Sequence, residues 1–372
     1  MRGLAASLPM TPGAENLRVR SLHQSCSAIG CDGMLITHLP NIRYLTGFTG
    51  SNAVVLVKAG RTWLFTDGRY IVQARQEVHG AKVRIVTKGS AMAAALQAAA
   101  GSSGRPRIGF EAEHLSAAAA QELIESVPSR LKLLPTCQLV EELRMVKDRQ
   151  EVRLLQKAVD LGSSLMRVPL RRLRPGATEV EVAAALEYEA RKSGAEGMSF
   201  DSIVAAGRRS AMPHGRASKN RIPAKGFVVL DFGVILAGYH SDMTRTVHVG
   251  RASRREKDTY AAVLEAQLAA IEMVKPGVEA GQVDEAARKV LQKFGLARYF
   301  THSTGHGVGI EIHEPPRLGQ GQKTLLKPGM VITIEPGVYI PGRFGIRIED
   351  MVEVTERGCR VMTPTPKELL EL

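Results

Sequence analysis

Two aspartates stand in the apolar stretch VVLDFGVILAGYHSDMTRTVHV, residues 228–249. The stretch predicts two β-strands around a short turn, and each strand carries one carboxylate, Asp231 or Asp242. A turn centred within residues 235–238 would place the two aspartates opposite each other, with β-carbons about 5 Å apart. Two bare carboxylates at that distance repel by roughly 3 kcal/mol at an effective dielectric constant of about 20. A shared proton, a cation between them, or exposure of both at a sheet edge would each resolve the repulsion.

A second strand–turn–strand pattern, near the C-terminus, also carries an acid on each arm. In VITIEPGVYIPGRFGIRIEDMVEV, Glu335 lies on the first arm and Glu349 on the second. Arg347, Glu349 and Met351 share one face of the second arm by the two-residue period of a strand. Arg347 is therefore placed either to hold the Glu349 carboxylate or to bind a substrate carbonyl or carboxylate.

Three histidines lie between the two hairpins, in HSTGHGVGIEIHEPP: His302, His306 and His313. Gly305 and Gly307 flank His306, so the backbone there can approach another segment closely. The alternative interpretation of GHGVG, a phosphate-binding loop, lacks the GxxxxGK[ST] pattern and the strand–loop–helix setting that such a loop requires.

Taken in chain order, these residues form a set of hard metal ligands: Asp231, Asp242, His306, Glu335 and Glu349. Four carboxylates balance the charge of two divalent ions, and ions about 3.5–4 Å apart can share bridging carboxylates and a bridging water. Such a water loses its proton near neutral pH and becomes a nucleophile. Oxygen-rich ligation with one nitrogen favours Mn²⁺, with Co²⁺, Fe²⁺ and Zn²⁺ as alternatives.

The elements that must position these residues predict an α+β fold. Residues 1–140 predict a smaller α/β domain, in which apolar strand patterns such as NAVVLV and RTWLFTD alternate with helical stretches. Residues 141–372 predict a larger domain, in which helices cover a largely antiparallel sheet. Its first helix is expected to run without interruption through LVEELRMVKDRQEVRLLQKAVDLGSSLM, and the next to begin at Thr178 and stop at Gly194.

Composition limits the class of protein further. The chain has 372 residues, of which 44% are hydrophobic and 23% charged, as is typical of globular proteins. The net charge of +13 would suit an anionic partner, but the arginines are scattered, which favours a basic solvated surface over nucleic-acid binding. Four cysteines without CxxC pairing indicate reduced thiols and a cytoplasmic location. The opening MRGLAASLPMTPG is too short for a signal peptide, and no run of about 20 apolar residues predicts a membrane span.

Four motifs carry a family resemblance: LDFGVILAGYHSDMTRT, STGHGVGIEIHEPP, TIEPGVYIPGRFGIRIED and SFDSIVAAGRRSAMPHGRAS. They resemble those of the methionine aminopeptidase/aminopeptidase P clan of metallopeptidases, which have the pita-bread fold. Within that clan the chain is most similar to Xaa-Pro aminopeptidases and prolidases. HLPNIRYLTGFTGSNAVVLV and WLFTDGRYIVQA also resemble the creatinase-like N-terminal domain of these enzymes. The resemblance thus implies a creatinase-like domain over residues 1–140 and a pita-bread catalytic domain over residues 141–372.

The resemblance also implies roles for individual residues. It makes all five residues of the ligand set metal ligands, with Asp242 and Glu349 bridging two ions, and makes Glu335 the acid–base catalyst. It further implies catalytic or substrate-binding roles for a second set: His214, His302, His313 and Arg347. Thr244 shares a strand face with Asp242 and is placed to orient it.

The reaction implied is hydrolysis of the N-terminal Xaa-Pro bond of peptides with proline at the second position, by attack of a metal-bridging hydroxide. The family also implies a homodimer or a higher homo-oligomer.

Other functions are open at this point. A prolidase, restricted to Xaa-Pro dipeptides, would use the same ligands and differ in how the far end of the peptide is enclosed. A methionine aminopeptidase would not need the N-terminal domain. A metal-free relative, either a creatinase-like hydrolase or a binding module on the same fold, would lack ligands that are all present in this chain.

Overall fold

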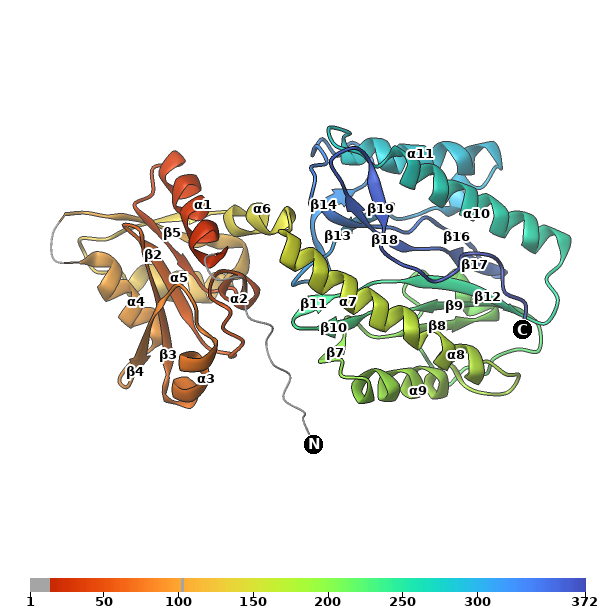
Figure 1. Cartoon of the computed structure of the whole chain (residues 1–372), viewed down its shortest axis with the longest axis horizontal. Helices are drawn as coiled ribbons and strands as arrows, with labels where there is room; N and C mark the ends of the chain where they lie inside the picture. The colour runs from red at the N-terminus through yellow and green to blue at the C-terminus, as the bar shows by residue number, and fades with distance from the viewer. Residues whose placement is uncertain (1–13, 102–103) are drawn as a thin grey trace. The chain divides into compact units, whose positions relative to one another are not determined.

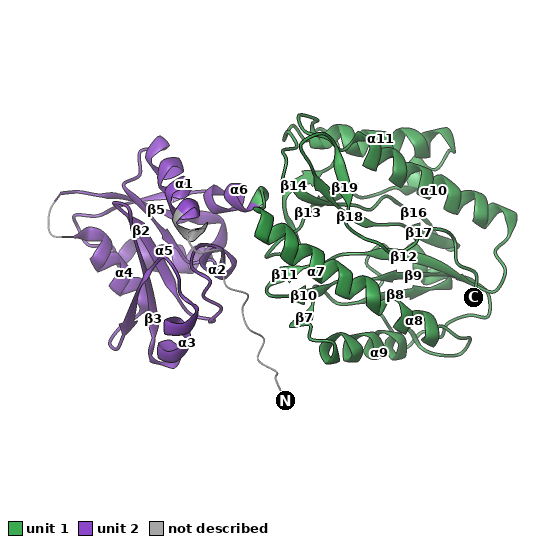
Figure 2. Ribbon diagram, in the orientation of Figure 1, with its two compact units in different colours: residues 1–5, 145–372 green, residues 6–144 purple. Residues whose placement is uncertain are grey.

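The computed structural model describes residues 14–101 and 104–372, which form two compact units that divide between Arg144 and Met145 (Figure 1, Figure 2). The opening segment, for which no signal peptide is predicted, lies outside the described residues. Among the described residues, no helix combines the length and the apolar character needed to cross a membrane.

The unit that ends at Arg144 is built on a mixed six-stranded sheet. The strands follow the order β4 (Lys82–Val86), β3 (Arg61–Asp67), β2 (Val54–Lys58), β1 (Gly33–Ile36), β5 (Arg107–Glu111) and β6 (Lys132–Thr136). The helices are α1 (Ala14–Ala28), α2 (Leu39–Thr46), α3 (Ile71–Glu77), α4 (Ala91–Ala100), α5 (Ala117–Glu125) and α6 (Leu139–Met145). The three central strands pair in antiparallel fashion, and the outer pairs are parallel. The α/β prediction for this region is confirmed.

The unit that begins at Met145 carries the candidate site. Its helices are α7 (Arg149–Leu165), α8 (Arg167–Arg172), α9 (Glu179–Lys192), α10 (Arg254–Met273) and α11 (Ala280–Lys293). One sheet has the order β12 (Thr244–Val249), β9 (Gly226–Asp231), β8 (Ile203–Ala206), and a small one the order β11 (Tyr239–His240), β10 (Val234–Leu236), β7 (Gly197–Met198). A longer sheet has the order β14 (Glu314–Leu318), β13 (Gly305–Gly307), β15 (Val331–Ile334), β18 (Asp350–Val354), β19 (Cys359–Val361), and β16 (Gly337–Ile340) pairs with β17 (Phe344–Arg347). These strand pairs are all antiparallel, as predicted.

Helices pack on the outer faces of these sheets (Figure 1). Helix α9 shares a buried apolar cluster with β9 and β12, to which Leu230 and Val247 belong, whereas α10 and α11 share another with β15 and β18. Because side chains alternate along a strand, Asp231 and Thr244 point away from the helices that cover Leu230 and Val247. The inner faces of the sheets are thus available for polar groups.

Two helix predictions have different outcomes. The single long helix is wrong: the chain breaks after Met145, and α7 begins anew with Asp148 as its N-cap, in a capping box with Glu151. The Asp148 side chain accepts from the first free N–H groups of α7, which makes a new start favourable there. The prediction for α9 is confirmed, since Thr178 caps its start and Gly194, at φ 99°, follows its end.

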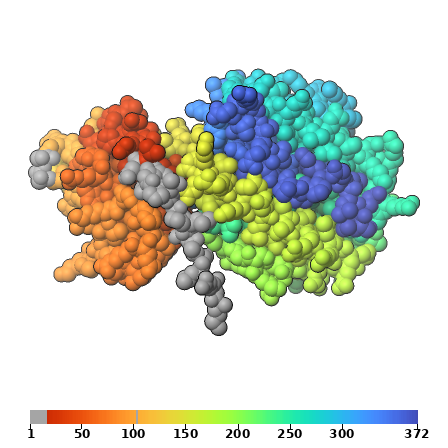
Figure 3. All heavy atoms as spheres, in the orientation of Figure 1, coloured from red at the N-terminus to blue at the C-terminus, as the bar shows by residue number. Residues whose placement is uncertain are grey.

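The exposed face of this unit brings α7 and α8 beside the C-terminal residues. Figure 3 shows the yellow-green residues of these helices at the surface, next to the dark blue end of the chain. The Gln156 side chain donates to the main-chain oxygen of Met362 at 3.0 Å, which joins the two segments. The C-terminal residues are therefore part of the unit that begins at Met145.

The first aspartate hairpin has a register different from the predicted one. Ala237 and Gly238, at φ 50° and 77°, form the turn between β10 and β11, so the turn lies one residue later than expected. Asp231 consequently pairs with Thr244 and not with Asp242. The predicted direct opposition of the aspartates is wrong, but the two-residue period keeps both on one face as diagonal neighbours.

Candidate metal centre

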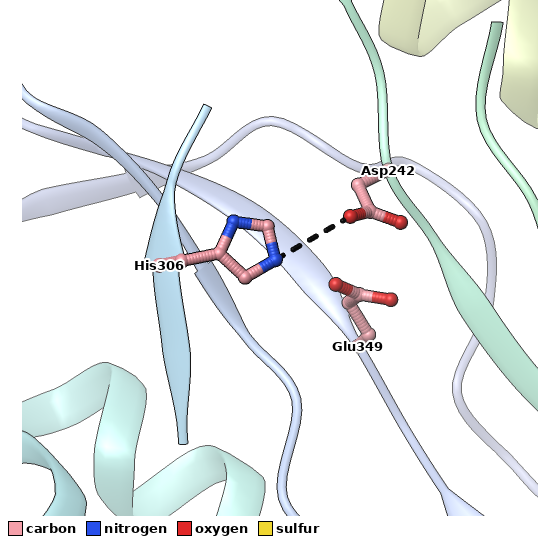
Figure 4. Close-up of side chains that lie close together, drawn as sticks. All are labelled: Asp242, His306 and Glu349. Carbon is pink, nitrogen blue, oxygen red and sulfur yellow. Dashed lines mark ion pairs between the residues drawn. The ribbon is translucent and has the colours of Figure 1, made fainter. Parts of the chain in front are cut away.

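Three side chains from three segments meet in the unit that begins at Met145 (Figure 4). Asp242 precedes β12, His306 lies in β13 and Glu349 lies between β17 and β18. One ligand atom from each side chain lies within 4.8 Å of those of the other two. The His306 Nε2 atom is 3.7 Å from Asp242 Oδ2. This spacing suits a shared cation.

Glu335 joins this group from the strand beside Glu349. The pairing of β15 with β18 and of β16 with β17 keeps one register, which places Glu335 opposite Glu349 in the break between the two ladders. The Glu335 Oε1 atom is 3.5 Å from His306 Nε2. The predicted convergence of acids from two hairpins with one imidazole is therefore present in the geometry.

The glycines beside His306 let its strand enter a crowded position. A β-carbon on Gly305 would lie 1.9 Å from the main-chain oxygen of Thr333, and one on Gly307 would lie 2.2 Å from that of Pro315. Any side chain at either position would push β13 away from its neighbours. The predicted close approach of the backbone is confirmed.

The Arg347 side chain links the two hairpins by hydrogen bonds. Its guanidinium donates to Asp231 Oδ2, to Thr244 Oγ1 at 3.0 Å and to the Tyr339 hydroxyl at 2.6 Å. Thr244 Oγ1 in turn donates to Glu349 Oε2 at 2.8 Å. One oxygen of Asp231 and one of Glu349 are thereby fixed in direction, which is what a rigid metal site requires.

The second oxygens of the same two carboxylates are buried. Within residues 14–101 and 104–372, no group donates a hydrogen bond to Asp231 Oδ1 or Glu349 Oε1. A buried carboxylate oxygen without a donor carries a desolvation penalty that a cation would offset. The residues present therefore fit a divalent metal ion.

The electrostatics of the protein without ions lead to the same conclusion. Burial, together with neighbouring carboxylates, raises the pKa of Asp242 and that of Glu349 well above their usual range. Burial raises the pKa of Glu335 to about 8, and Asp231 adds to that increase while Arg347 opposes it. Carboxyls pressed together in this way are ionised readily only when positive charge is brought among them.

His306 is prepared as a neutral ligand. Burial lowers the pKa of its imidazole to about 4. Its Nδ1–H donates to the main-chain oxygen of Gly307 at 3.0 Å, which leaves the lone pair of Nε2 facing Asp242 and Glu335. This fixed tautomer is the one that a metal ion needs.

The other three predicted histidines lie around this group of ligands. The His313 ring is 4.4 Å from the His306 ring, centroid to centroid, and its residue is exposed. His302 donates from Nδ1 to the main-chain oxygen of Ser303 and accepts at Nε2 from Tyr339. His214 is exposed and is close enough to His302 and His313 for its charge to lower the pKa of both.

Sequence reasoning missed three residues that touch this site. Tyr339 connects Arg347 to His302, and Thr333 Oγ1 accepts from the His306 N–H at 3.1 Å. Both follow the two-residue period through Glu335, so that period was the available signal. Arg317 is exposed and pairs with His306 across β13 and β14, a relation that no local pattern predicts.

Antiparallel sheets enclosed by helices, with buried carboxylates and a neutral imidazole at their centre, define a metal-dependent hydrolase of the pita-bread type. The chain belongs to metallopeptidase family M24, whose model matches residues 153–356. Residues 18–146 match the creatinase/prolidase N-terminal domain. Membership of this family implies divalent metal ions at the site.

Several known proteins are similar over long stretches. An Xaa-Pro dipeptidase of Pyrococcus furiosus is 45% identical over 232 residues, which are 62% of this chain and 67% of that protein. The solved Xaa-Pro dipeptidase from Bacillus anthracis is 39% identical with a TM-score of 0.92, covering 96% of this chain and 100% of that chain. The solved X-Pro aminopeptidase from Thermotoga maritima MSB8 is 35% identical with a TM-score of 0.86, covering 94% and 100%. The family and the fold that the motifs predict are confirmed.

Proposed function

We propose that this protein hydrolyses the bond between an N-terminal residue and a following proline, with two divalent ions bound by the ligand set: Asp231, Asp242, His306, Glu335 and Glu349. The observation that carries the proposal is the pair of buried, unpartnered oxygens on Asp231 and Glu349, beside the neutral Nε2 of His306. Mn²⁺ is the first candidate because oxygen ligands outnumber nitrogen.

The chemistry divides between the ions and the chain. When bound, the ions supply Lewis-acid activation of water and of the scissile carbonyl. Glu335, beside His306 Nε2, is the carboxylate that takes up and returns the proton of the water. Arg347 and Thr244 keep Asp231 and Glu349 in place during that transfer.

Substrate selection follows from the chemistry of proline. An Xaa-Pro bond has no N–H on the proline nitrogen, so the peptide must be held by its amino end and by the proline ring. A bound metal ion, or Asp231, would receive the amino end. His313 and His214 are the candidates for holding the carbonyl and the proline side. The leaving nitrogen must gain a proton before it departs. His302 acts through Tyr339 on Arg347.

Two substrate lengths fit this proposal. The first prediction from the sequence is cleavage of longer peptides, as by an Xaa-Pro aminopeptidase. The alternative, an Xaa-Pro dipeptidase, is favoured by Arg317, because residues paired across antiparallel strands project on the same face. An exposed guanidinium beside His306 would bind the free carboxylate of a dipeptide. The first two relatives named above are also dipeptidases.

One hydrolysis assay with Mn²⁺ tests both levels of the proposal. It compares Ala-Pro, a longer Ala-Pro peptide and a Met-Ala peptide, with wild type and Arg317→Leu. Cleavage of Ala-Pro substrates but not of Met-Ala supports the Xaa-Pro proposal, and the reverse pattern refutes it. If Arg317 binds the dipeptide carboxylate, its loss raises KM for Ala-Pro by about 10- to 100-fold and leaves the longer peptide unaffected. An equal effect on both peptides contradicts that role.

A further inference from the structure

A buried ion pair links the start of α7 to the segment that carries His313. Lys147 Nζ lies 3.0 Å from Glu314 Oε2, and the two side chains are 1% and 3% exposed. Lysine and glutamate are rarely buried unless paired, and removing one partner leaves an uncompensated charge. The pair lies outside the set of metal ligands, and nothing in the proposed chemistry uses its proton. Its burial therefore needs another explanation.

The Lys147 end of the pair is held rigidly by the main chain. Its N–H donates to the oxygen of Gly329 at 2.9 Å, and Val146 forms a bridge to Met330 at the entry to β15. A β-carbon on Gly329 would lie 2.7 Å from the main-chain oxygen of Lys147, so the two segments are in close contact. The main chain that carries the ammonium group is consequently fixed in position.

At the other end, the chain wraps around the Glu314 carboxylate. Glu314 Oε1 accepts from the N–H of Glu311 at 3.1 Å. Its Oε2 would lie 2.4 Å from a β-carbon on Gly309, so only glycine leaves room for it. The Gly309 N–H also donates to the Glu311 oxygen at 3.0 Å. The carboxylate is thus the centre around which residues 309–314 fold, and His313 is part of that fold.

A second contact, from the first turn of α7, supports this segment. The Tyr239 hydroxyl donates to Glu151 Oε1 at 2.9 Å, both groups being buried. The next residue, His240, donates its N–H to the Gly309 oxygen at 2.9 Å. Lys147 and Glu151 thus reach both ends of one segment, residues 309–314. Figure 1 shows α7 lying beside β10 and β11, as these contacts require.

We propose that Lys147, through its buried ion pair with Glu314, is a positioning residue for His313. The inference rests on the proposed function only in giving His313 a substrate to hold. Loss of the ammonium group removes the counter-charge of the carboxylate around which the segment folds, so the His313 ring moves relative to His306. A displacement of about 1 Å in a positioning group costs about 100-fold in rate.

A double-mutant cycle tests this role by activity. The variants are Lys147→Met, His313→Ala and the two combined, assayed on Ala-Pro with metal content measured for each. We expect Lys147→Met to lower kcat/KM by about 100-fold with metal content unchanged, and to cause no further loss in the His313→Ala background. Full activity in Lys147→Met, or losses that multiply in the combined variant, would overturn the proposal.

Hydrogen exchange gives a readout that needs no substrate. Amides of residues 309–313 exchange at least about tenfold faster in Lys147→Met than in wild type if the ion pair orders them. Leu186→Ala is the control, because it destabilises the α9 core without touching this segment. Unchanged exchange in Lys147→Met overturns the inference, whether or not the wild type cleaves Xaa-Pro substrates. Failure of the wild type to cleave any Xaa-Pro substrate would refute only the proposed function. If Lys147→Met fails to fold, Lys147→Met/Glu314→Gln, which buries no charge, takes its place with the same expectations.

Discussion

Replacement of Thr244 by valine removes one hydroxyl that bonds to two ionisable side chains. Its Oγ1 accepts from Arg347 Nε and donates to Glu349 Oε2, and the residue is fully buried. Valine has nearly the same shape, so the change deletes both hydrogen bonds and leaves no cavity. Without metal, the pKa of Glu349 is raised well above its usual range, so only the bond from Arg347 involves a charged group. At about 1.5–3 kcal/mol for a bond to a charged group and about 0.5–1.5 kcal/mol for the other, the free energy of unfolding falls by about 2–4.5 kcal/mol.

The same change also alters metal binding. Glu349 then lacks its fixed direction, and loss of a group that orients a metal ligand typically costs about 10- to 100-fold in affinity. Urea denaturation of the metal-free protein measures the first effect, and titration of that protein with Mn²⁺ measures the second. Both effects are expected together in Thr244→Val.

Thr304→Val is the matched control for this variant. Thr304 is buried, and its hydroxyl donates to the Asp284 carboxylate at 2.9 Å, outside the set of metal ligands. Thr304→Val loses one hydrogen bond to a charged group, so its free energy of unfolding is expected to fall by about 1.5–3 kcal/mol. Its Mn²⁺ affinity is expected to match that of wild type. Wild-type affinity in Thr244→Val, or equal weakening in both variants, would show that the Thr244 hydroxyl does not orient Glu349 for metal.

Three further predictions concern pH, metal and substrate. In the metal-free protein, burial raises the pKa of Glu335 to about 8, so the folded state binds more protons than the unfolded state and stability falls as pH rises. The buried His302 and His306, with pKa values lowered to about 4, oppose this trend only below the usual histidine range. Tm should therefore fall between about pH 6.5 and 8, and a flat Tm there in metal-free protein would contradict the electrostatics. Glu349→Ala should lose metal and activity together, as measured by metal analysis and Ala-Pro hydrolysis; retention of activity after metal loss would refute its role. His214→Ala should keep its metal and lower turnover by about 10²-fold or more, the range of a proton-transfer or positioning group; loss of metal in this variant would show that its role is different.

Local patterns predicted the residues that meet in the site but not how they meet. The acids and His306 were found because strand periodicity and flanking glycines are short-range signals. The register of the first hairpin was not found, because Ala237 adopts a left-handed conformation that residue type does not favour. That one-residue change in the turn made Thr244, and not Asp242, the partner of Asp231.

Contacts between distant segments account for the rest of what was missed. Two contacts of the site join residues more than one hundred positions apart: Arg347 with Asp231, and Thr244 with Glu349. Lys147 and Glu314 are further apart still, and each has an ordinary sequence setting. The start of a new helix after Asp148 did have a local signal, the D-x-x-E capping box. The apolar periodicity of the surrounding residues masked it.

The most direct test of the account is diffraction from crystals of this protein grown with Mn²⁺, recorded at the manganese absorption edge. Two bound ions would give two anomalous peaks about 3.5–4 Å apart, with Asp242 and Glu349 contacting both and His306 contacting one. No peak among these side chains, or peaks only at the protein surface, would contradict it.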